Sequence, residues 1–385
     1  MTASSSSPRV LLTGASGFIG GSVLTQLLDS ASPTFQSSPI TCLVRSADRA
    51  AKLTEAYGDR VRPVLYKGID DLETATAVAA QHDLVFSATV GYHPPSVRAL
   101  LEGLAQRKRA NPGSEPWLIH SSSTSNVGSR PISGAWLDND SPKGRTFDDA
   151  VDDVYGYETE RDAKEPFVQR TGELSVVNAG LELDVRTLVV MAPTVYGIGS
   201  GLFNKRSVQI PAYVATALDH GRAVMIGDGE GVLDHVHVQD LAALYEILAL
   251  RALDKKGADL PWGKKGIIFA NQGQHSWGDV ARGVARAGHD AGVLRDATVD
   301  SLGLAEATKL FTESFLGLAN ELVVELGLAS SGQTTPTVAL GLGWKPARGD
   351  EAWQRGFRDD VDAMLKERRD KGHEVKDFSV YTEAK

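Results

Sequence analysis

The stretch Val10-Leu-Leu-Thr-Gly-Ala-Ser-Gly-Phe-Ile-Gly20 decides the fold, because its glycines lie between an apolar run and a helix-like segment. Val10 to Thr13 predicts a strand, and Phe18 to Leu28 predicts a helix. In such a unit the glycines allow a tight turn, the close approach of a pyrophosphate and close packing of helix on strand. The helix N-terminus also favours an anion. The stretch therefore predicts a dinucleotide-binding turn, made of Gly14, Ser16, Gly17, Phe18, Ile19 and Gly20. The alternative is a glycine-rich turn without a ligand.

The alternation of strand and helix continues along the first half of the chain. Repeated units of this length favour a parallel, doubly wound sheet with helices on both faces. The sequence therefore predicts an α/β protein with a Rossmann fold. Further expected strands are Ile40 to Arg45, Val61 to Tyr66, Leu84 to Ala88, Trp117 to Ser121 and Leu183 to Met191. Further expected helices are Ala47 to Ala56, Leu72 to Gln81 and Val97 to Arg109.

The pattern changes in two places. From Asn126 to Glu165 the periodicity is lost, which is typical of a lid or a disordered insertion. After Ala192 a glycine-rich loop leads to Phe203. The segments expected beyond it are a hairpin over Val224 to Val238 that turns at Gly227 to Gly229, and helices over Pro211 to His220, Asp240 to Ala252, Trp277 to Gly288 and Leu302 to Leu326.

These changes predict two domains. Residues 9–200 form the Rossmann domain, and residues 201–366 mainly form a smaller C-terminal α/β substrate domain. Residues from about 231 to 275 are expected to return to the Rossmann core. Residues 1–8 and 367–385 are expected to be flexible ends.

Composition excludes several classes of protein. The formal net charge of −9 argues against a nucleic acid or an anionic membrane as the main partner. The single cysteine, Cys42, excludes an internal disulfide, so the cytoplasm is the expected compartment. No apolar stretch reaches the length of a membrane helix. His235 and His237 lack a ligand set with metal spacing, and no metal is expected. A G-x-S-x-G hydrolase turn is absent too.

Residues after the second expected strand bear on the choice of dinucleotide. Sites that prefer NAD place an acidic residue there, which binds the ribose 2′-hydroxyl. Here the strand ends in Arg45, and Ser46 and Arg49 follow. A cation suits a 2′-phosphate, so NADP is expected, with NAD as the alternative and a merely solvated Arg45 as the other reading. Asp71, or its neighbour Asp70, could lie beside the adenine.

Several ordered motifs resemble the extended short-chain dehydrogenase/reductase superfamily and, within it, the NAD-dependent epimerase/dehydratase family. The similarity covers roughly residues 9 to 366. Its motifs are Thr13 to Gly20, Ala88-Thr-Val90, Ser121-Ser-Ser-Thr-Ser-Asn-Val-Gly128, Met191-Ala-Pro-Thr-Val-Tyr-Gly197, Gly227-Asp-Gly-Glu230, Val236-His-Val-Gln-Asp-Leu241 and Leu342-Gly-Trp-Lys-Pro346.

The resemblance implies an active site in the cleft between the two domains. Ala88, Thr89 and Val90 would then line the nicotinamide side of the cofactor, and Ser121 would also bind the cofactor. Pro193, Thr194 and Val195 would close over the carboxamide, and Tyr196 to Asn204 would begin the substrate loop. His237 and Asp240 look like a structural hydrogen-bonding corner of the family. Members often form homodimers through a helix pair, for which Val97 to Arg109 is the candidate, although its apolar face could equally be core.

The family's catalytic signature is incomplete in this chain. In the family, a Ser or Thr after the fifth strand holds the substrate oxygen. Ser123 occupies that position when the run is aligned on Val127-Gly128, and Ser121, Ser122 and Thr124 are the alternatives. The family's Tyr-x-x-x-Lys pair passes a proton, because the lysine lowers the pKa of the phenol. The closest match is Tyr157-Glu-Thr-Glu-Arg161, in which arginine cannot exchange a proton. An alignment anchored on Glu173 instead places the pair on Glu165 and Gln169.

Three functions remain open. The leading one is an NADP(H)-dependent oxidoreductase that acts on a carbonyl or hydroxyl of a small metabolite, with Ser123, Tyr157 and Arg161 as its catalytic residues. The second is an epimerase or dehydratase that retains its cofactor. The third is a catalytically silent protein that senses the dinucleotide, as in relatives without the Tyr and Lys pair. If Tyr157 and Arg161 are an incidental part of an acidic loop, other groups such as Tyr155 or Arg170 would act.

Overall fold

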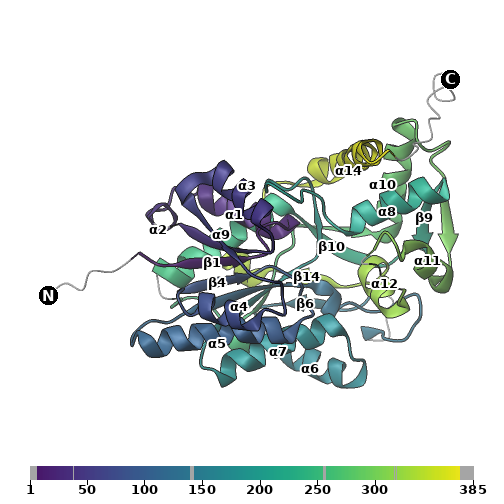
Figure 1. Cartoon of the computed structure of the whole chain (residues 1–385). Coiled ribbons are helices and arrows are strands. Elements are labelled where there is room, and N and C mark those ends of the chain that lie inside the picture. Colours follow the sequence, from purple (N-terminus) through teal and green to yellow (C-terminus); the bar gives the residue numbers. More distant parts are fainter. Residues whose placement is uncertain are drawn as a thin grey trace.

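The computed structural model describes residues 7–37, 39–138, 143–254, 257–315, 317 and 319–372. Its larger lobe holds a seven-stranded parallel sheet in the order β11-β7-β5-β4-β1-β2-β3 (Figure 1). This order confirms the predicted doubly wound Rossmann sheet. The strands are β1 (Val10–Thr13), β2 (Ile40–Val44), β3 (Val61–Leu65), β4 (Leu84–Ser87), β5 (Trp117–Ser123), β7 (Arg186–Ala192) and β11 (Ile267–Phe269).

Helices cover both faces of this sheet (Figure 1). One face carries α1 (Phe18–Asp29), α2 (Pro33–Gln36), α3 (Ala47–Tyr57) and α9 (Val238–Asp254), and the other carries α4 (Leu72–Ala79), α5 (Pro94–Ala110), α6 (Val154–Lys164) and α7 (Val168–Glu182). Short 3-10 turns are η1 (Gly58–Arg60), η2 (Thr124–Asn126) and η4 (Gly263–Lys265).

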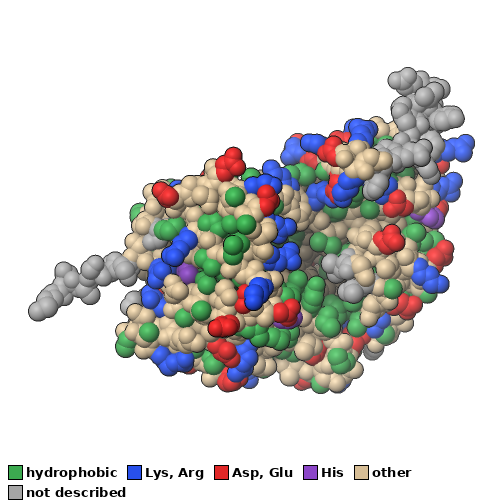
Figure 2. All heavy atoms as spheres, viewed as in Figure 1, with side chains coloured by type: hydrophobic (Ala, Val, Ile, Leu, Met, Phe, Trp, Pro, Cys, Tyr) green, Lys and Arg blue, Asp and Glu red, His purple; other side chains and the backbone are tan. Residues whose placement is uncertain are grey.

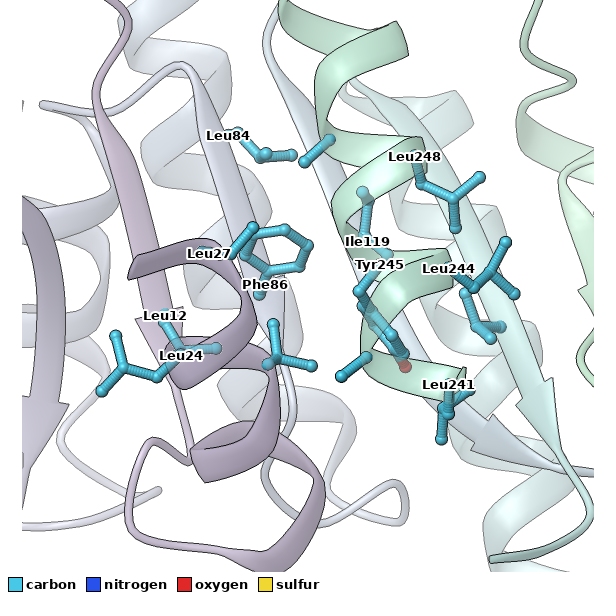
Figure 3. Close-up of a cluster of buried hydrophobic side chains, with 14 of the residues drawn as sticks. Leu12, Leu24, Leu27, Leu84, Phe86, Ile119, Leu241, Leu244, Tyr245 and Leu248 are labelled. Carbon is cyan, nitrogen blue, oxygen red and sulfur yellow. The ribbon is translucent and has the colours of Figure 1, made fainter. Parts of the chain in front are cut away.

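A continuous apolar core lies beneath α1 and α9. Strand residues alternate between the two faces of a sheet, so Leu12, Phe86 and Ile119 point toward these helices. Leu24 of α1 and Leu244 of α9 pack onto the same cluster (Figure 3). Residues from the second half of the chain thus complete the core of the Rossmann lobe.

The second lobe has its own core and lies beside the carboxyl ends of the strands (Figure 1). It contains α8 (Gln209–His220), β9 (Ala223–Ile226), α10 (Trp277–Asp290), β13 (Val299–Leu302), α11 (Leu304–Phe311), α12 (Glu321–Leu328) and α14 (Asp350–Asp370). Smaller sheets lie between the lobes: β8 (Thr194–Tyr196) with β10 (Val232–His237) and β12 (Gly273–Ser276), and β6 (Thr146–Asp148) with β14 (Gln333–Thr335). The short helix α13 (Thr337–Gly341) packs against β11 of the Rossmann lobe.

Two elements of the second lobe differ from the sequence prediction. The hairpin over Val224 to Val238 does not form, because β9 pairs in parallel with β13 while β10 pairs with β8 and β12. The long helix over Leu302 to Leu326 is divided into α11 and α12. Gly317 has a φ of +67° between them, and the Asn320 side chain caps the new helix.

Two further expectations are corrected. The segment from Asn126 to Glu165 was expected to be irregular, yet it contains β6 and the three-turn helix α6, which the Asp153 side chain caps. The C-terminal end was expected to be flexible from residue 367, but α14 continues to Asp370. An ion pair between Arg206 and Glu367 attaches its last turn to the rest of the lobe. Residues 1–6 and 373–385 of the expected ends lie outside the described residues.

Candidate functional site

The glycine turn is pressed against the end of the neighbouring strand. Gly14 has a φ of +77°, and a Cβ there would collide with the carbonyl oxygen of Ala88 just after β4. A Cβ on Gly20 would collide with the carbonyl oxygen of Gly14. Both positions therefore require glycine for the close approaches that hold α1, β1 and β4 together.

The N-terminus of α1 differs from those of its neighbours. Gly17 provides no side-chain cap, and the first turn holds no acidic residue. By contrast, Ser46 caps α3 and Asp71 caps α4. An uncapped N-terminus of a 12-residue helix leaves N–H groups and a positive dipole end for an anion. The turn thus fits the pyrophosphate of a dinucleotide, with Phe18 and Ile19 supplying its first helical N–H groups.

Two arginines follow β2: Arg45 comes directly after the strand, and Arg49 lies in the first turn of α3. Arg45 is exposed, and an Nη1 of Arg49 donates a 2.9 Å hydrogen bond to Ser16 Oγ in the turn. The Arg49 guanidinium also lies 5.9 Å from the centre of the Phe203 ring. Within the part of the chain that the structure describes, no carboxylate forms an ion pair with either arginine. Their charge is therefore available to an anion beside the turn.

Asp71 has a structural task. Its carboxylate accepts hydrogen bonds from the backbone N–H groups of Lys67, at 2.9 Å, and Thr74, at 3.4 Å. The bond from Lys67, followed by those from Thr74, lowers the pKa of this carboxyl. The carboxylate caps α4, and its proposed contact with adenine stays a prediction. Asp70 pairs with His93 instead, at 3.2 Å.

The carboxyl ends of β4, β5 and β7 bring the other expected cofactor residues to one edge of the sheet. Ala88, Thr89 and Val90 follow β4 and are half-buried. Ser123 of β5 pairs in register with Ala192 of β7, directly before Pro193, and Val195 lies in β8. Ser121 Oγ is 2.6 Å from the Tyr245 hydroxyl of α9. This edge is where open α/β sheets bind ligands.

Gln169 reaches the same edge from α7. A Cβ on Gly91 would lie 3.7 Å from Gln169 Cγ and 3.7 Å from the carbonyl oxygen of Ser121. A Cβ on Gly172, one turn along, would collide with the carbonyl oxygen of Gly91. The start of α7 therefore packs on the residues that follow β4. Of the two alignments of the family's catalytic helix, the one anchored on Glu173 puts a residue, Gln169, at this edge.

Tyr157 and Arg161 share a face of α6, as their spacing predicts, but both are engaged in a polar network. The Tyr157 hydroxyl donates to the Asp138 carboxylate at 2.9 Å. It accepts from the Trp136 indole N–H and from Arg161 Nη1, each at 3.2 Å. Burial, despite the positive charge of Arg161, raises the pKa of Tyr157 to about 12. The arrangement holds the phenol neutral, whereas a proton-transferring tyrosine needs a lowered pKa.

The network continues from Arg161 toward the second lobe. Glu165 accepts a hydrogen bond from Arg161 Nη2 at 3.0 Å and one from Arg130 Nη1 at 2.7 Å. Arg130 Nε donates to Glu325, a fully buried residue of α12, at 2.9 Å. Glu165 therefore joins the lobes as an ion-pair partner. The catalytic role of Tyr157 and Arg161 stays a prediction, and their contacts favour a structural one.

A pair of carboxyl groups lies beneath the loop that follows β5. Glu173 of α7 accepts hydrogen bonds from Ser122 Oγ and, at 2.8 Å, from Asn126 Nδ2. Glu158 of α6 lies against it, and both residues are fully buried. Burial raises the pKa of Glu173 to about 7, and burial together with the charge of Glu173 raises the pKa of Glu158 well above its usual value. Burial therefore favours the protonated, neutral form of both carboxyl groups.

Ser123, the expected catalytic serine, follows Ser122 in β5. Its side chain therefore points to the opposite face of the strand from the carboxyl pair. Its Oγ accepts hydrogen bonds from Ser125 N, at 3.2 Å, and from Ser125 Oγ, at 3.1 Å. It caps η2 and is half-buried at the sheet edge. Its catalytic role stays a prediction.

The alternative groups face elsewhere. The Tyr155 hydroxyl donates to Asn178 on the outer side of α7, at 2.7 Å. Arg170 is fully buried, and its Nε donates to the carbonyl oxygen of Asn126 at 2.9 Å. Burial lowers the pKa of Arg170 to about 10. Both side chains support α6 and α7 rather than the sheet edge.

Sequence reasoning missed Glu158, Asn126 and the role of Glu173. The sequence of α6 does contain a signal for this pair. Val154, Glu158 and Arg161 are spaced to lie on one face of the helix, which is buried, and two of these three residues are ionisable. Charged residues on a buried face need partners from other elements, and those partners are distant in sequence.

Asp240 and His237 form the expected corner. Asp240 accepts from Arg348 Nη1 at 2.7 Å and from its backbone N–H at 2.9 Å. A Cβ on Gly197 would collide with the His237 ring, and burial lowers the pKa of His237 to about 4. The corner fastens the segment around Trp344, whose indole N–H donates to the carbonyl oxygen of Asp240 at 2.8 Å.

Comparison with known proteins identifies the family. The family model described as NAD dependent epimerase/dehydratase family matches residues 163–259. The oxidase ucsJ of an Acremonium species is 31% identical over 313 residues, which cover 78% of this chain and 85% of that protein. The chain belongs to the NAD-dependent epimerase/dehydratase family. Binding of NAD(P) is typical of this family of extended short-chain dehydrogenases/reductases, as the glycine turn predicts.

Solved structures of this NAD-dependent epimerase/dehydratase fold agree with the architecture. A dTDP-glucose 4,6-dehydratase double mutant from Streptomyces venezuelae, with NAD bound, has a TM-score of 0.60 at 15% identity, covering 94% of this chain and 98% of that one. The UDP-glucuronic acid 4-epimerase of Bacillus cereus, with NAD and UDP-glucuronic acid, has a TM-score of 0.56 at 14% identity, covering 93% and 99%. At these identities the likeness is one of fold.

Two features are absent from the described residues. They contain no helix long and apolar enough to cross a membrane. They also contain no group of three or more His, Cys, Asp or Glu side chains placed to hold a metal ion.

Proposed function

We propose that the chain is an NADP(H)-dependent oxidoreductase that transfers a hydride between the cofactor and a carbonyl or hydroxyl carbon of a small metabolite. The observation that carries this proposal is the uncapped N-terminus of α1 beside Arg45 and Arg49. The first feature suits a pyrophosphate, and the second suits a 2′-phosphate. Figure 2 shows the surface hollowed between the two lobes, with Lys and Arg side chains along one edge of the hollow.

Each part of the site has a task under this proposal. The N–H groups at Phe18 and Ile19 bind the pyrophosphate, and Arg45 and Arg49 bind the 2′-phosphate. Bound NADP(H) would supply the hydride chemistry, while the protein orients the reacting carbon and excludes water. Gln169 contributes amide donors and acceptors at the edge where Ala88 and Ser121 lie, but it cannot lower a phenol pKa by charge.

The relative's name supports a redox reaction in preference to an epimerisation, since the Acremonium protein is called an oxidase. The loop after Tyr196 holds Leu202, Phe203 and Asn204, and of the two basic residues that follow, Lys205 and Arg206, only Lys205 is exposed. Arg206 is engaged with Glu367. A non-sugar metabolite is therefore the proposed substrate.

Turnover of NADPH against a panel of aldehydes and ketones tests this function, with NADP and the matching alcohols for the reverse direction. We expect one mole of NADPH to be oxidised per mole of carbonyl consumed. Failure across a broad panel, with the cofactor still binding tightly, would contradict the oxidoreductase. NAD that co-purifies and shows no net turnover would instead favour an epimerase or dehydratase.

A second candidate is a regulatory protein that binds the dinucleotide without using it. The observation that favours it is the Tyr157 hydroxyl, which donates to Asp138 and has a raised pKa. Calorimetry decides between the candidates when it is combined with the turnover assay. A sensor binds NADPH, shows no turnover, and keeps its affinity in Tyr157→Phe.

A further inference from the structure

A strap of ten residues, 197–206, connects β8 to the substrate lobe and runs over the start of α1. Its backbone is bonded to the glycine turn, because Asn204 N donates to the carbonyl oxygen of Ser16 at 3.4 Å. Ser200 N donates to Ser22 Oγ at 3.3 Å. The Thr25 hydroxyl donates to the carbonyl oxygen of Ser200 at 3.2 Å. The strap is therefore attached to the turn and to the first two turns of α1.

Glycines allow the backbone of the strap to pack closely against α1. A Cβ on Gly201 would lie 2.7 Å from Gly21 Cα. A Cβ on Gly199 would lie 3.0 Å from the Phe18 ring and 3.1 Å from Ser22 Oγ. Any larger residue at Gly201 would have to push the strap away from the helix, because its nearest neighbour there is backbone.

Phe203 extends from the strap to Arg49 in the first turn of α3. Its ring is half-buried and lies 5.9 Å from the Arg49 guanidinium. Arg49 also donates one hydrogen bond, from Nη1 to Ser16 Oγ at 2.9 Å. A guanidinium carries five N–H donors, so the remaining ones are available to an anion. Phe203 and Ser16 thus hold the cation on two sides without neutralising it.

The other end of the strap is fixed to the substrate lobe. Arg206 forms an ion pair with Glu367 of α14, and its Nη1 lies 3.3 Å from Met364 Sδ. Gln209, at the start of α8, donates to the carbonyl oxygen of Gly327 at 2.8 Å. The strap therefore connects the adenosine end of the expected cofactor site with the lobe that would bind substrate.

We propose that the strap is a wall of the cofactor site that recognises the 2′-phosphate of NADP(H), through Arg49 held by Phe203 and Ser16. This inference rests on the proposed NADP(H) function, which already includes Arg49, and adds Phe203 of the strap as a residue that determines cofactor specificity by positioning Arg49. A 2′-phosphate adds charge-assisted hydrogen bonds to Arg49, and NAD has no group that could replace them. The strap is therefore expected to be more ordered when NADP(H) is bound than when NAD(H) is bound.

Hydrogen exchange of the purified full-length chain tests the strap directly. Peptides that cover residues 197–206 are compared without ligand, with saturating NADP and with saturating NAD. We expect NADP to slow exchange of the strap amides by about tenfold more than NAD, because only NADP adds bonds to Arg49. Equal protection by the two dinucleotides would overturn the proposal.

Equilibrium binding to variants provides a second readout. Phe203→Ala should reduce the ratio of NADP to NAD affinity by about five- to tenfold, and Arg49→Ala should reduce it by more. Val208→Ala is the matched control, since this exposed side chain lies just outside the strap and should leave the ratio unchanged. If Phe203→Ala weakens both dinucleotides equally, the strap is only a cover and the proposal is wrong.

The outcomes separate the strap from the function on which it rests. Failure of the wild-type chain to bind either dinucleotide would contradict the proposed function and the strap together. Tight NADP binding without extra strap protection would contradict the strap alone.

Discussion

The polar groups of two regions of the molecule are paired in opposite ways. At the start of α1, the helix N-terminus has no side-chain cap, and Arg45 and Arg49 have no carboxylate partner among the described residues. In the network of α6 and α7, by contrast, Tyr157 and Arg161 are bonded to one another and to acidic neighbours. Groups left unpaired beside a cleft are suited to a ligand, and groups that satisfy each other are suited to holding the fold. The contrast separates binding of the cofactor from its use.

The largest expected effect is at the glycine turn. Gly14→Ala forces a left-handed φ on a residue with a side chain, and its Cβ collides with the Ala88 carbonyl oxygen. We expect binding of NADP to weaken by at least about 100-fold, because the turn must move away from β4. Equilibrium fluorescence titration with NADPH measures the loss.

Gly113→Ala is the control for that variant. Gly113 also has a positive φ, +91°, but no atom lies within 4 Å of the added Cβ. It should cost about 1 kcal/mol of stability and leave NADP affinity unchanged. Equal affinity of the Gly14 variant and the wild type would place the dinucleotide elsewhere.

The next effect concerns the two arginines. Replacing Arg45 and Arg49 together by alanine removes both cations that follow β2, so NADP should bind about 10- to 100-fold more weakly. NAD affinity should change by less than about twofold, since NAD lacks the phosphate. Calorimetric titration of both dinucleotides gives the ratio, and a parallel loss for NAD would mean that the arginines support the turn rather than read the phosphate.

Sequence alone could predict the binding half of this comparison because its residues are local. Gly14, Gly17 and Gly20 lie within seven residues, and the strand and helix around them follow from simple periodicity. Arg45 then follows from the order of the strands. The strap could not be predicted from the sequence, because Ser16 and Asn204 are almost 190 residues apart and come into contact only in the folded chain.

The catalytic half could be predicted only in part for the same reason. The spacing of Tyr157 and Arg161 correctly predicts that they share a helical face. Their partners Asp138 and Trp136 lie in a segment without periodicity, so the sequence gives no sign that the phenol is already bonded. The parallel pairing of β9 with β13 was missed likewise, since glycines at a turn suggest a hairpin unless distant strands compete.

Tyr157→Phe is expected to have a smaller effect, which concerns the stability of the fold and not the binding of the cofactor. It removes the bond to Asp138 and leaves a half-buried carboxylate with one donor fewer, so we expect a loss of about 1 to 2 kcal/mol in the free energy of unfolding. NADP affinity should stay within about twofold, and turnover within several-fold, of the wild type. Tyr155→Phe, on the outer side of α6, is the matched control. A loss of turnover of about 100-fold or more would restore Tyr157 as the proton donor.

The smallest effect is on the pH dependence of stability. Because the pKa of Glu173 is raised to about 7 in the folded chain, its stabilising contribution is complete below its unfolded value of 4.5 and is lost as pH rises through about 7. The raised pKa of Glu158 extends this loss of stability to higher pH.

Glu158→Gln keeps the shape and removes one ionisable group. Between pH 5 and pH 8 the variant should therefore lose about 1 kcal/mol less unfolding free energy than the wild type. Urea denaturation at the two pH values measures the difference, with the exposed Glu160→Gln on the same helix as the control. Identical pH slopes in Glu158→Gln and the wild type would contradict the raised pKa of Glu158.

Calorimetric titration of the purified chain with NADPH and with NADH tests the central claim most directly. The uncapped turn and the two arginines predict one NADPH per chain, bound at least about tenfold more tightly than NADH. An equal or higher affinity for NADH, or no heat of binding for either dinucleotide, would contradict the account.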